Sequence, residues 1–146
     1  MFMLEEEELE NQYLLIEALS ERYPQMLLSP PLLPEEVESY VRGMNSYERE
    51  FVKILQNRGL IVFREPELCD YDCKPDFFVY NPYIDQGKIV EVTLLNKEFT
   101  NSNCDRKTKE RKIRQFKRME ASGIPFVVMY RENLENIREY CCRNLF

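Results

Sequence analysis

Two acidic residues stand where a β-strand would normally bury hydrocarbon. Asp76 begins the apolar run over 76–80, and Glu91 lies inside a second apolar run, KIVEVTLL, over 88–95. Strand side chains alternate between faces, so Glu91 and Thr93 share one face of their strand and the flanking apolar residues share the other. Two carboxylates at close range repel one another and raise a pKa unless a cation lies between them. The pattern therefore predicts a site for a hard divalent cation, Mg²⁺ or Mn²⁺, which prefers such oxygen ligands together with water and phosphate.

The chain contains no histidine, which removes the commonest general base and the imidazole metal ligands. Hydrolytic chemistry here would use carboxylates, lysines and hard metal ions. Of five cysteines, Cys69 and Cys73 form a C-x3-C pair, and a zinc site completed by Cys104 or by Cys141 and Cys142 is an alternative. Because there is no second well-spaced pair and the number is odd, the pattern favours buried or half-buried thiols.

The elements that must position these acids follow a mixed order over residues 45–146. A capping-box spacing, Asn45 with Glu48 three residues later, predicts the start of a helix that ends at Gly59, with an apolar stripe of Tyr47, Phe51, Ile54 and Leu55. The helix is expected over 45–58, strands over 60–63, 76–80, 88–95 and 125–130, a long helix over 104–122 and a last amphipathic helix carrying Leu134, Ile137, Tyr140 and Cys141. This order predicts an α/β fold, a small mixed sheet flanked by helices.

The first 44 residues are expected to form a helical extension packed on that core. Residues 5–22 predict a helix with acids in its first turns. Pro24, Pro30 and Pro31 then interrupt the chain, and Pro34 opens a short helix that ends near Gly43. We therefore divide the chain into an extension, 1–44, and a main domain, 45–146.

Composition restricts the class of protein. A chain of 146 residues with 44% hydrophobic and 12% aromatic residues has enough apolar side chain for one core and is unlike a disordered chain. No apolar run approaches the length of a membrane span, and the acidic start, MFMLEEEELE, is unlike a secretory signal. We expect a cytoplasmic protein, of a cell or of its host, that has no contact with membrane.

Positive charge is concentrated between residues 106 and 118. This segment has eight cations and one acid, a local charge of +7, which leaves −13 for the remainder of a chain with net charge −6. A basic helix is often only a solvated face. Beside a predicted metal site it indicates a nucleic-acid partner, because phosphate contacts supply much of the affinity for nucleic acid.

The helical period divides these cations between two faces. The inward side is marked by Ile113, Phe116 and either Met119 or Glu120. The cations that precede them at helical spacing are Lys109, our first candidate to reach the acids, and Lys112, our second. Gln115 is a polar neighbour one turn on, and Lys97, in the preceding loop, is a weaker candidate. The residues expected to contact nucleic acid are Arg106, Lys107, Arg111, Arg114, Gln115, Lys117 and Arg118.

The order of the acidic motifs resembles the PD-(D/E)XK nuclease superfamily. Pro75-Asp76, followed fifteen residues after the Asp by Glu91-Val92-Thr93, is preceded by Glu48 on a helix. The resemblance spans about 45–130 and implies a restriction-endonuclease-like core. It implies that Asp76, Glu91 and the Val92 carbonyl bind Mg²⁺ or Mn²⁺, and that Glu48 holds a second ion or a metal-bound water. Helix geometry also turns Glu48 further toward the apolar stripe than Glu50.

Two subfamilies share further features with the chain. SYEREFVKILQNRGLIVFREP is similar to the opening of archaeal Holliday junction resolvases, which implies structure-specific DNA cleavage by a homodimer. Thr93 stands where the superfamily usually has Lys. The cap-snatching endonucleases of segmented RNA viruses also have Thr there and use a lysine from the next helix, which implies such a role for Lys109 or Lys112.

The sequence therefore predicts a metal-dependent nuclease that hydrolyses phosphodiester bonds, with DNA favoured over RNA. Two alternatives remain open. Because Thr93 cannot supply a cation, the domain could be a degenerate nuclease fold that only binds nucleic acid or a protein partner. It could also be an interaction module that uses the acidic N-terminal helices as its contact surface.

Overall fold

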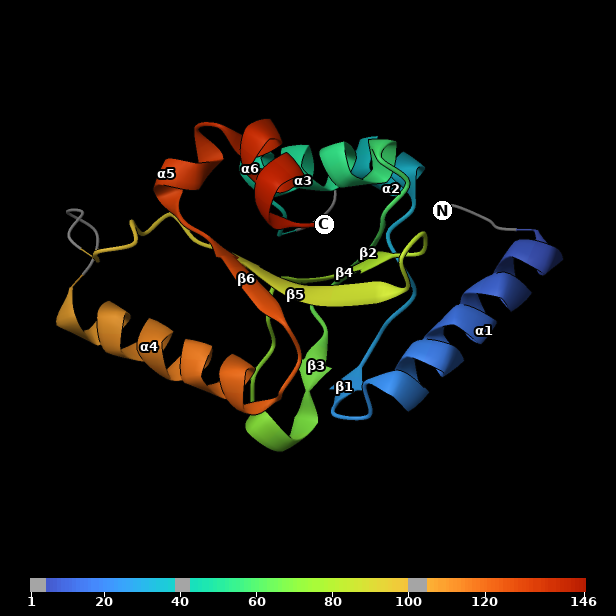
Figure 1. Cartoon of the computed structure of the whole chain (residues 1–146), viewed down its shortest axis with the longest axis horizontal. Helices are drawn as coiled ribbons and strands as arrows, with labels where there is room; N and C mark the ends of the chain where they lie inside the picture. Colours follow the sequence, from blue (N-terminus) through green and yellow to red (C-terminus); the bar gives the residue numbers. More distant parts are fainter. Residues whose placement is uncertain (1–4, 39–42, 100–104) are drawn as a thin grey trace.

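A four-stranded mixed sheet forms the centre of the computed structural model, which describes residues 5–38, 43–99 and 105–146 (Figure 1). The strands are β2 (Ile61–Arg64), β4 (Phe77–Asn81), β5 (Gln86–Val92) and β6 (Phe126–Met129), in the order β2-β4-β5-β6. β2, β4 and β5 are antiparallel neighbours, and β6 is parallel to β5. The predicted mixed α/β class is confirmed.

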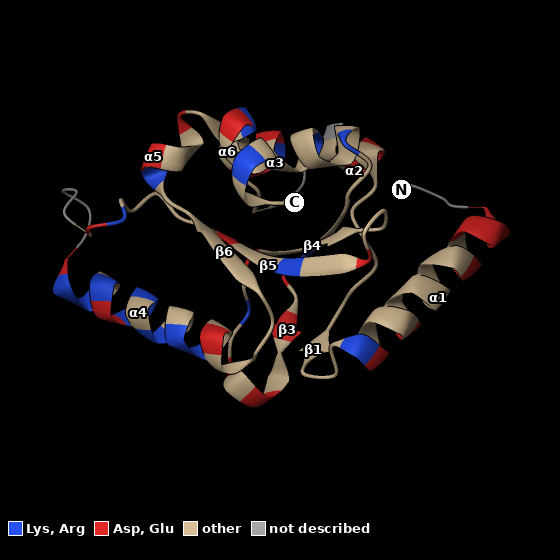
Figure 2. Cartoon of the chain, viewed as in Figure 1, with Lys and Arg blue, Asp and Glu red and all other residues tan. Residues whose placement is uncertain are grey.

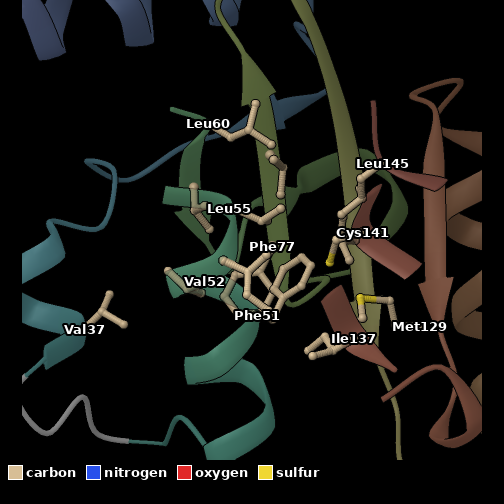
Figure 3. Close-up of a cluster of buried hydrophobic side chains, with 14 of the residues drawn as sticks. Val37, Phe51, Val52, Leu55, Leu60, Phe77, Met129, Ile137, Cys141 and Leu145 are labelled. Carbon is tan, nitrogen blue, oxygen red and sulfur yellow. The ribbon is translucent and has the colours of Figure 1, made fainter. Parts of the chain in front are cut away.

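Helices lie on both sides of this sheet (Figure 1). α3 (Ser46–Asn57), α2 (Pro34–Glu38), α5 (Arg131–Leu134) and α6 (Ile137–Asn144) lie on one side, and α4 (Arg106–Ala121) and α1 (Glu6–Arg22) lie on the other. The strand alternation divides the core accordingly. One cluster, shown in Figure 3, contains Phe51, Phe77 and Val90, and the other contains Phe78 and Ile89. Side chains with the parity of Phe78 and Ile89 therefore face α4.

The start of α3 follows the predicted cap, but its buried face is rotated from the expected one. The Asn45 side chain accepts from the Glu48 backbone N–H at 2.9 Å, and Gly59, at φ +80°, follows the helix. Val52 is fully buried, which the predicted stripe omitted, and it rotates the buried face toward Glu48. Tyr47, predicted in that stripe, is 44% exposed for the same reason.

Two other element boundaries differ from the prediction. β5 begins at Gln86 and ends at Val92, and the chain leaves the sheet after Thr93, so Leu94 is 54% exposed rather than in the apolar face. The last amphipathic segment forms two short helices, α5 and α6, rather than one. Leu134, on α5, and Ile137, on α6, are both buried, so the apolar pattern holds across the break. Cys104, the predicted start of the long helix, lies outside the described residues.

A second, two-stranded sheet was not predicted. β1 (Met26–Leu27) pairs antiparallel with β3 (Glu67–Leu68), and a 3-10 turn, η1 (Cys69–Tyr71), follows β3. Met26 and Leu68 are buried in the cluster that faces α4. Strands of two residues are too short to show the alternation of apolar and polar residues from which a strand is predicted.

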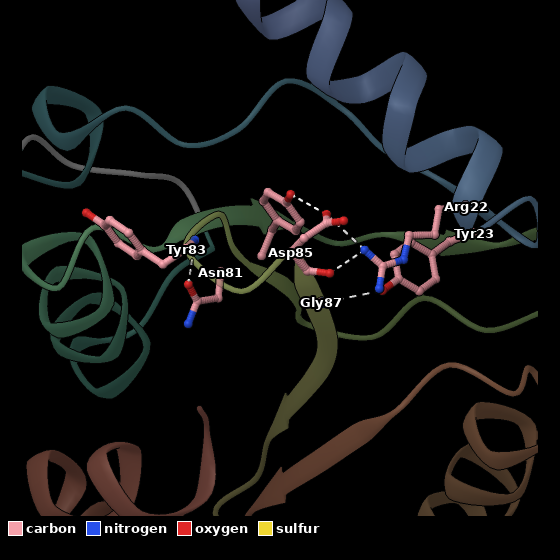
Figure 4. Close-up of polar contacts among 7 residues, drawn as sticks. Arg22, Tyr23, Asn81, Tyr83, Asp85 and Gly87 are labelled. Carbon is pink, nitrogen blue, oxygen red and sulfur yellow. Dashed lines mark hydrogen bonds and ion pairs between the residues drawn. The ribbon is translucent and has the colours of Figure 1, made fainter.

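The C-terminal end of α1 is tied to the β4–β5 turn (Figure 4). The Arg22 guanidinium forms an ion pair with the Asp85 carboxylate at 2.9 Å and also donates to the Asp85 carbonyl. The Tyr80 hydroxyl donates to the Asp85 carboxylate at 2.6 Å, and the Tyr23 hydroxyl accepts from the Gly87 N–H at 3.3 Å.

Across the described ranges, no helix combines the length and apolarity needed to cross a membrane.

Candidate functional site

Asp76 and Glu91 lie side by side on the sheet face that α4 covers. Phe77 pairs with Val90 in the antiparallel register, so the preceding Asp76 lies opposite Glu91 and the two side chains point the same way. Asp76 Oδ2 accepts from the Val92 backbone N–H at 2.8 Å, and the two carboxyl groups share a hydrogen bond. We call Asp76 and Glu91 the acid pair.

Glu91 is withdrawn from water. Its side chain is fully buried, and only 2% of the residue surface is exposed. Burial, and next the hydrogen bond and negative charge of Asp76, raise the pKa of Glu91 to about 9, while the positive charge of Lys112 opposes the rise. In the absence of a bound cation, the acid pair therefore holds a proton at neutral pH.

Two α4 side chains connect the helix to the acid pair. The Gln115 amide donates to Glu91 Oε2, and Lys112 Nζ donates to Gln115 Oε1 at 3.3 Å. Lys112 lies three residues before Gln115 and so projects from the same side of α4. Lys109, our first candidate from the sequence, lies six residues before Gln115, about 120° around the helix, and is exposed. The structure therefore places Lys112 at the site and Lys109 away from it.

Glu48 approaches the acid pair from the end of α3. Its side chain is half-buried, and burial and then the charge of Asp76 raise its pKa, whereas a backbone hydrogen bond from Asn45 and the charge of Arg64 lower it. The Glu48 carboxylate thus accepts a hydrogen bond at the helix cap and is also close enough to Asp76 to feel its charge. The influence of Arg64, at the end of β2, was not foreseen, because no spacing relates it to the acids.

The donor set fits a divalent cation held by few protein ligands. In the part of the chain that the structure describes, no group of three or more His, Cys, Asp or Glu side chains is placed to hold a metal ion. Mg²⁺ is commonly bound by one or two carboxylates, with water and substrate phosphate completing its shell. The acid pair meets that requirement, since a cation between the carboxylates would replace the shared proton. The structure does not bring Glu48 into a three-acid cluster.

Thr93 and Val92 continue the strand beside the acid pair. Thr93 is buried, its hydroxyl accepts from the Leu95 N–H at 3.2 Å, and its own N–H donates to the Met129 carbonyl at 2.9 Å. The Thr93 side chain thus closes the turn after β5. Lys97, the weaker candidate, is exposed, and its backbone N–H donates to Glu132.

The remaining cations of α4, apart from Lys109, form a strip on the side of the helix opposite its buried residues, as the helical period of 100° per residue places them. Figure 2 marks the Lys and Arg positions of α4 in blue. We call this strip the basic face. Arg118 donates to the Asp72 carbonyl at 3.1 Å, and Arg106 pairs with Glu110 at 3.0 Å. Its members are all exposed: Arg106, Lys107, Arg111, Arg114, Lys117 and Arg118. Gln115, grouped with them from the sequence, instead points inward to Glu91.

The four cysteines within the described residues do not form a metal-binding cluster. Cys69, Cys73, Cys141 and Cys142 are free thiols, and Cys104 lies outside the described residues. Cys73 is buried next to the site, where burial and then the charge of Glu91 raise the pKa of its thiol. The Cys73 thiol lies 4.0 Å from the Gln115 carbonyl oxygen, a contact that no sequence pattern indicated. Zinc binding by the four described thiols has no support in this arrangement.

Comparisons with known proteins add no assignment. No family model, curated protein or solved structure matches the chain.

Proposed function

We propose that this chain is a Mg²⁺- or Mn²⁺-dependent nuclease with a restriction-endonuclease-like core of the PD-(D/E)XK type, acting on DNA in preference to RNA. One observation carries the proposal: the acid pair, of which Glu91 is buried and Asp76 half-buried, is linked to Gln115 and through it to Lys112, beneath a helix whose outer face is basic. The element order α3, β2, β4, β5, α4, β6 agrees with the order expected from the resemblance.

Each group has a distinct role in this proposal. Asp76 and Glu91 would hold the cation, with the Val92 carbonyl as a further oxygen ligand and Glu48 acting through water. A cation held there would lower the pKa of a bound water and neutralise charge on the phosphate. Gln115 orients Glu91 by donating to it. Lys112 supplies the positive charge that Thr93 lacks and stabilises the charge that develops on the phosphate.

In this proposal the basic face binds nucleic acid along the side of α4 opposite its buried residues. Its six exposed cations project from one helix that lies over the acid pair, so they can bind successive phosphates of a nucleic-acid backbone. Contacts of this kind weaken steeply as salt is raised. They give affinity without reading sequence.

A second candidate function is nucleic-acid binding without cleavage. The observation that favours it is the Thr93 hydroxyl, which is bonded to Leu95 and contributes no charge to the site. Calorimetry separates the two functions. Salt-sensitive DNA binding without uptake of Mn²⁺ would support binding alone, whereas uptake of Mn²⁺ that Asp76→Ala abolishes supports the nuclease.

Replacement of Asp76 by alanine tests the nuclease directly. We expect cleavage of plasmid, single-stranded or branched DNA, or RNA, with Mn²⁺ to fall about a hundredfold or more, because the variant loses a proposed cation ligand and the partner of Glu91. Asp70→Ala, at an exposed acid on η1, is the matched control and should retain activity. Equal cleavage by wild type and Asp76→Ala would exclude the catalytic assignment.

The two lysines of α4 provide a second test. We expect Lys112→Ala to lower the cleavage rate about 10–100-fold, since it removes the charge bonded through Gln115 to the site. Lys109→Ala, an equal change of charge on the same helix, should change the rate by about twofold or less. Rates measured at saturating substrate separate this effect from binding. Equal losses would show that the helix acts only through its total charge.

A further inference from the structure

A cavity of about 460 Å³ opens along the outer edge of β6, the end strand of the sheet. Phe126 packs on the core cluster that faces α4, whereas Tyr140, from α6, packs on the other cluster. The cavity therefore lies where the two layers meet at the edge of β6. Its remaining side walls are Lys97, Tyr130, Asn133 and Asn144, together with the two central valines of β6.

Both tyrosine rings are held in fixed orientations. The Tyr140 hydroxyl donates to the Val128 carbonyl at 3.1 Å. Burial raises the pKa of Tyr140, so this hydroxyl keeps its proton. Tyr130 meets Phe116 of α4 edge to face, with ring centroids 6.4 Å apart and an interplanar angle of 87°. Rings fixed before binding lose little freedom when a flat ligand stacks on them.

Polar groups that suit a nucleotide line the same cavity. The Asn133 side-chain oxygen accepts a hydrogen bond from the Tyr130 backbone N–H. The Asn144 side-chain amide donates one hydrogen bond to the Tyr140 carbonyl. Each amide has more donor and acceptor positions than these bonds use. Lys97 adds a cation at the rim. Aromatic faces, amide edges and a cation together match a planar heterocycle that carries a phosphate.

A single strand, β6, separates the cavity from Glu91 of the acid pair. Val128, in the cavity wall, is directly opposite Glu91 in the parallel β5–β6 register. Phe116, which touches Tyr130, is the next residue after Gln115, which touches Glu91. A strand whose phosphate lies at the acid pair would place a neighbouring nucleotide at this edge.

We infer that this cavity is a binding site for an unpaired nucleobase of the substrate strand, so that the protein takes single-stranded nucleic acid or a single-stranded segment at a junction. This inference rests on the proposed nuclease function and specifies its substrate. A base within a duplex is stacked on its neighbours and cannot enter a side cavity, whereas an unpaired base can stack on an aromatic side chain.

The test compares ligands before it compares variants. Fluorescence anisotropy with EDTA present would measure binding of a labelled single strand, the same strand with abasic positions, and a duplex of equal length. We expect the abasic strand to bind about 5–50-fold more weakly than the intact strand, because stacking on an aromatic residue is lost. The duplex should resemble the abasic strand.

Variants then locate the effect. Tyr140→Leu keeps apolar volume and removes the ring, and it should reduce the preference for the intact strand while leaving abasic binding unchanged. Asn144→Ala and Lys97→Ala test the polar rim, where the fold is less at risk because both residues are exposed. Asn57→Ala, at an exposed amide on α3, is the control.

The outcomes separate the inference from the function on which it rests. Equal binding of intact and abasic strands overturns the base site, even if Asp76-dependent cleavage of DNA is observed. A preference for the intact strand that Tyr140→Leu, Asn144→Ala and Lys97→Ala all leave unchanged also overturns it. Absence of oligonucleotide binding at low salt overturns both. Binding of free mononucleotide but not of strands would show a small-molecule site instead.

Discussion

Replacement of Glu91 by glutamine is expected to stabilise the fold by about 2–3 kcal/mol at pH 7 while abolishing cleavage. Burial and Asp76 raise the pKa of Glu91 to about 9, from a usual 4.5. At pH 7 the folded chain must therefore hold a proton that the unfolded chain has released, which costs about 3 kcal/mol. Glutamine needs no proton, can accept from Gln115 and can donate to Asp76, so it removes this cost.

The sign of the pH dependence follows from the same raised pKa. Below about pH 4.5 both states hold the proton, and Glu91 does not reduce the free energy of unfolding. As pH rises from about 4.5 to about 9, only the folded state keeps it, so the stability of the wild type falls relative to Glu91→Gln by about 1.4 kcal/mol per unit. Thermal unfolding from pH 4 to 9 should show melting temperatures that diverge, with the variant about 5–10 °C higher at pH 7.

Two measurements control this result. Glu120→Gln changes an exposed acid on α4 and should alter the free energy of unfolding by less than about 0.5 kcal/mol at any pH. Mn²⁺ should stabilise the wild type at neutral pH and leave Glu91→Gln nearly unchanged, because a ligand stabilises only the state that binds it. A variant less stable than the wild type at pH 8 would show that Glu91 is ionised in the fold.

Replacement of Gly87 by alanine is expected to cost about 2–3 kcal/mol. A Cβ at this position would overlap Cζ of Phe78, closer than two non-bonded carbon atoms can approach. The Phe78 ring cannot move aside easily, because it is fully buried between Tyr23, at 5.3 Å between centroids, and Phe63, at 6.1 Å. Overpacking of a filled core has this cost. Urea unfolding monitored by circular dichroism would measure it.

Another glycine provides the comparison. Gly123 has φ +76° and no atom within 4 Å of an added Cβ, so Gly123→Ala should cost only about 1 kcal/mol, from the left-handed backbone. Adding Phe78→Leu to Gly87→Ala should relieve the clash and give a coupling of at least about 1 kcal/mol in a double-mutant cycle. If the losses of stability from Gly87→Ala and Phe78→Leu simply add in the double variant, the effect of Gly87→Ala does not come from the Phe78 contact.

The sequence predicted the main helices and strands where a period or a cap was present, although the ends of β5 and the break between α5 and α6 were missed. Asn45 and Gly59 marked both ends of α3, and the alternation around Glu91 correctly placed this residue on the face away from Val90. The contact between Asp76 and Glu91 followed from antiparallel pairing. The two-residue strands β1 and β3 were missed because tertiary contacts alone define them.

The choice between Lys109 and Lys112 shows a second limit. Both lysines have helical spacing to the inward apolar residues, so period alone could not rank them. The rank depends on Gln115, whose side chain joins Lys112 to Glu91. A hydrogen bond between side chains of two separate elements leaves no mark on hydrophobic periodicity. The sequence can therefore show which residues belong to one face of a helix, but not which of them lies nearest to the acid pair.

The parallel pairing of β5 with β6 has a kinetic consequence. β2, β4 and β5 are joined through antiparallel neighbours, whereas β6 returns to β5 only after the chain has passed through α4. Such a crossover closes late in folding, since a long loop must be ordered before its contacts form. Gln115 and Lys112 belong to that crossover, so we expect the acid pair to form before these two side chains reach it. In the proposed nuclease, activity would therefore depend on the docking of α4, and a chain in which this crossover has not yet closed is expected to lack it.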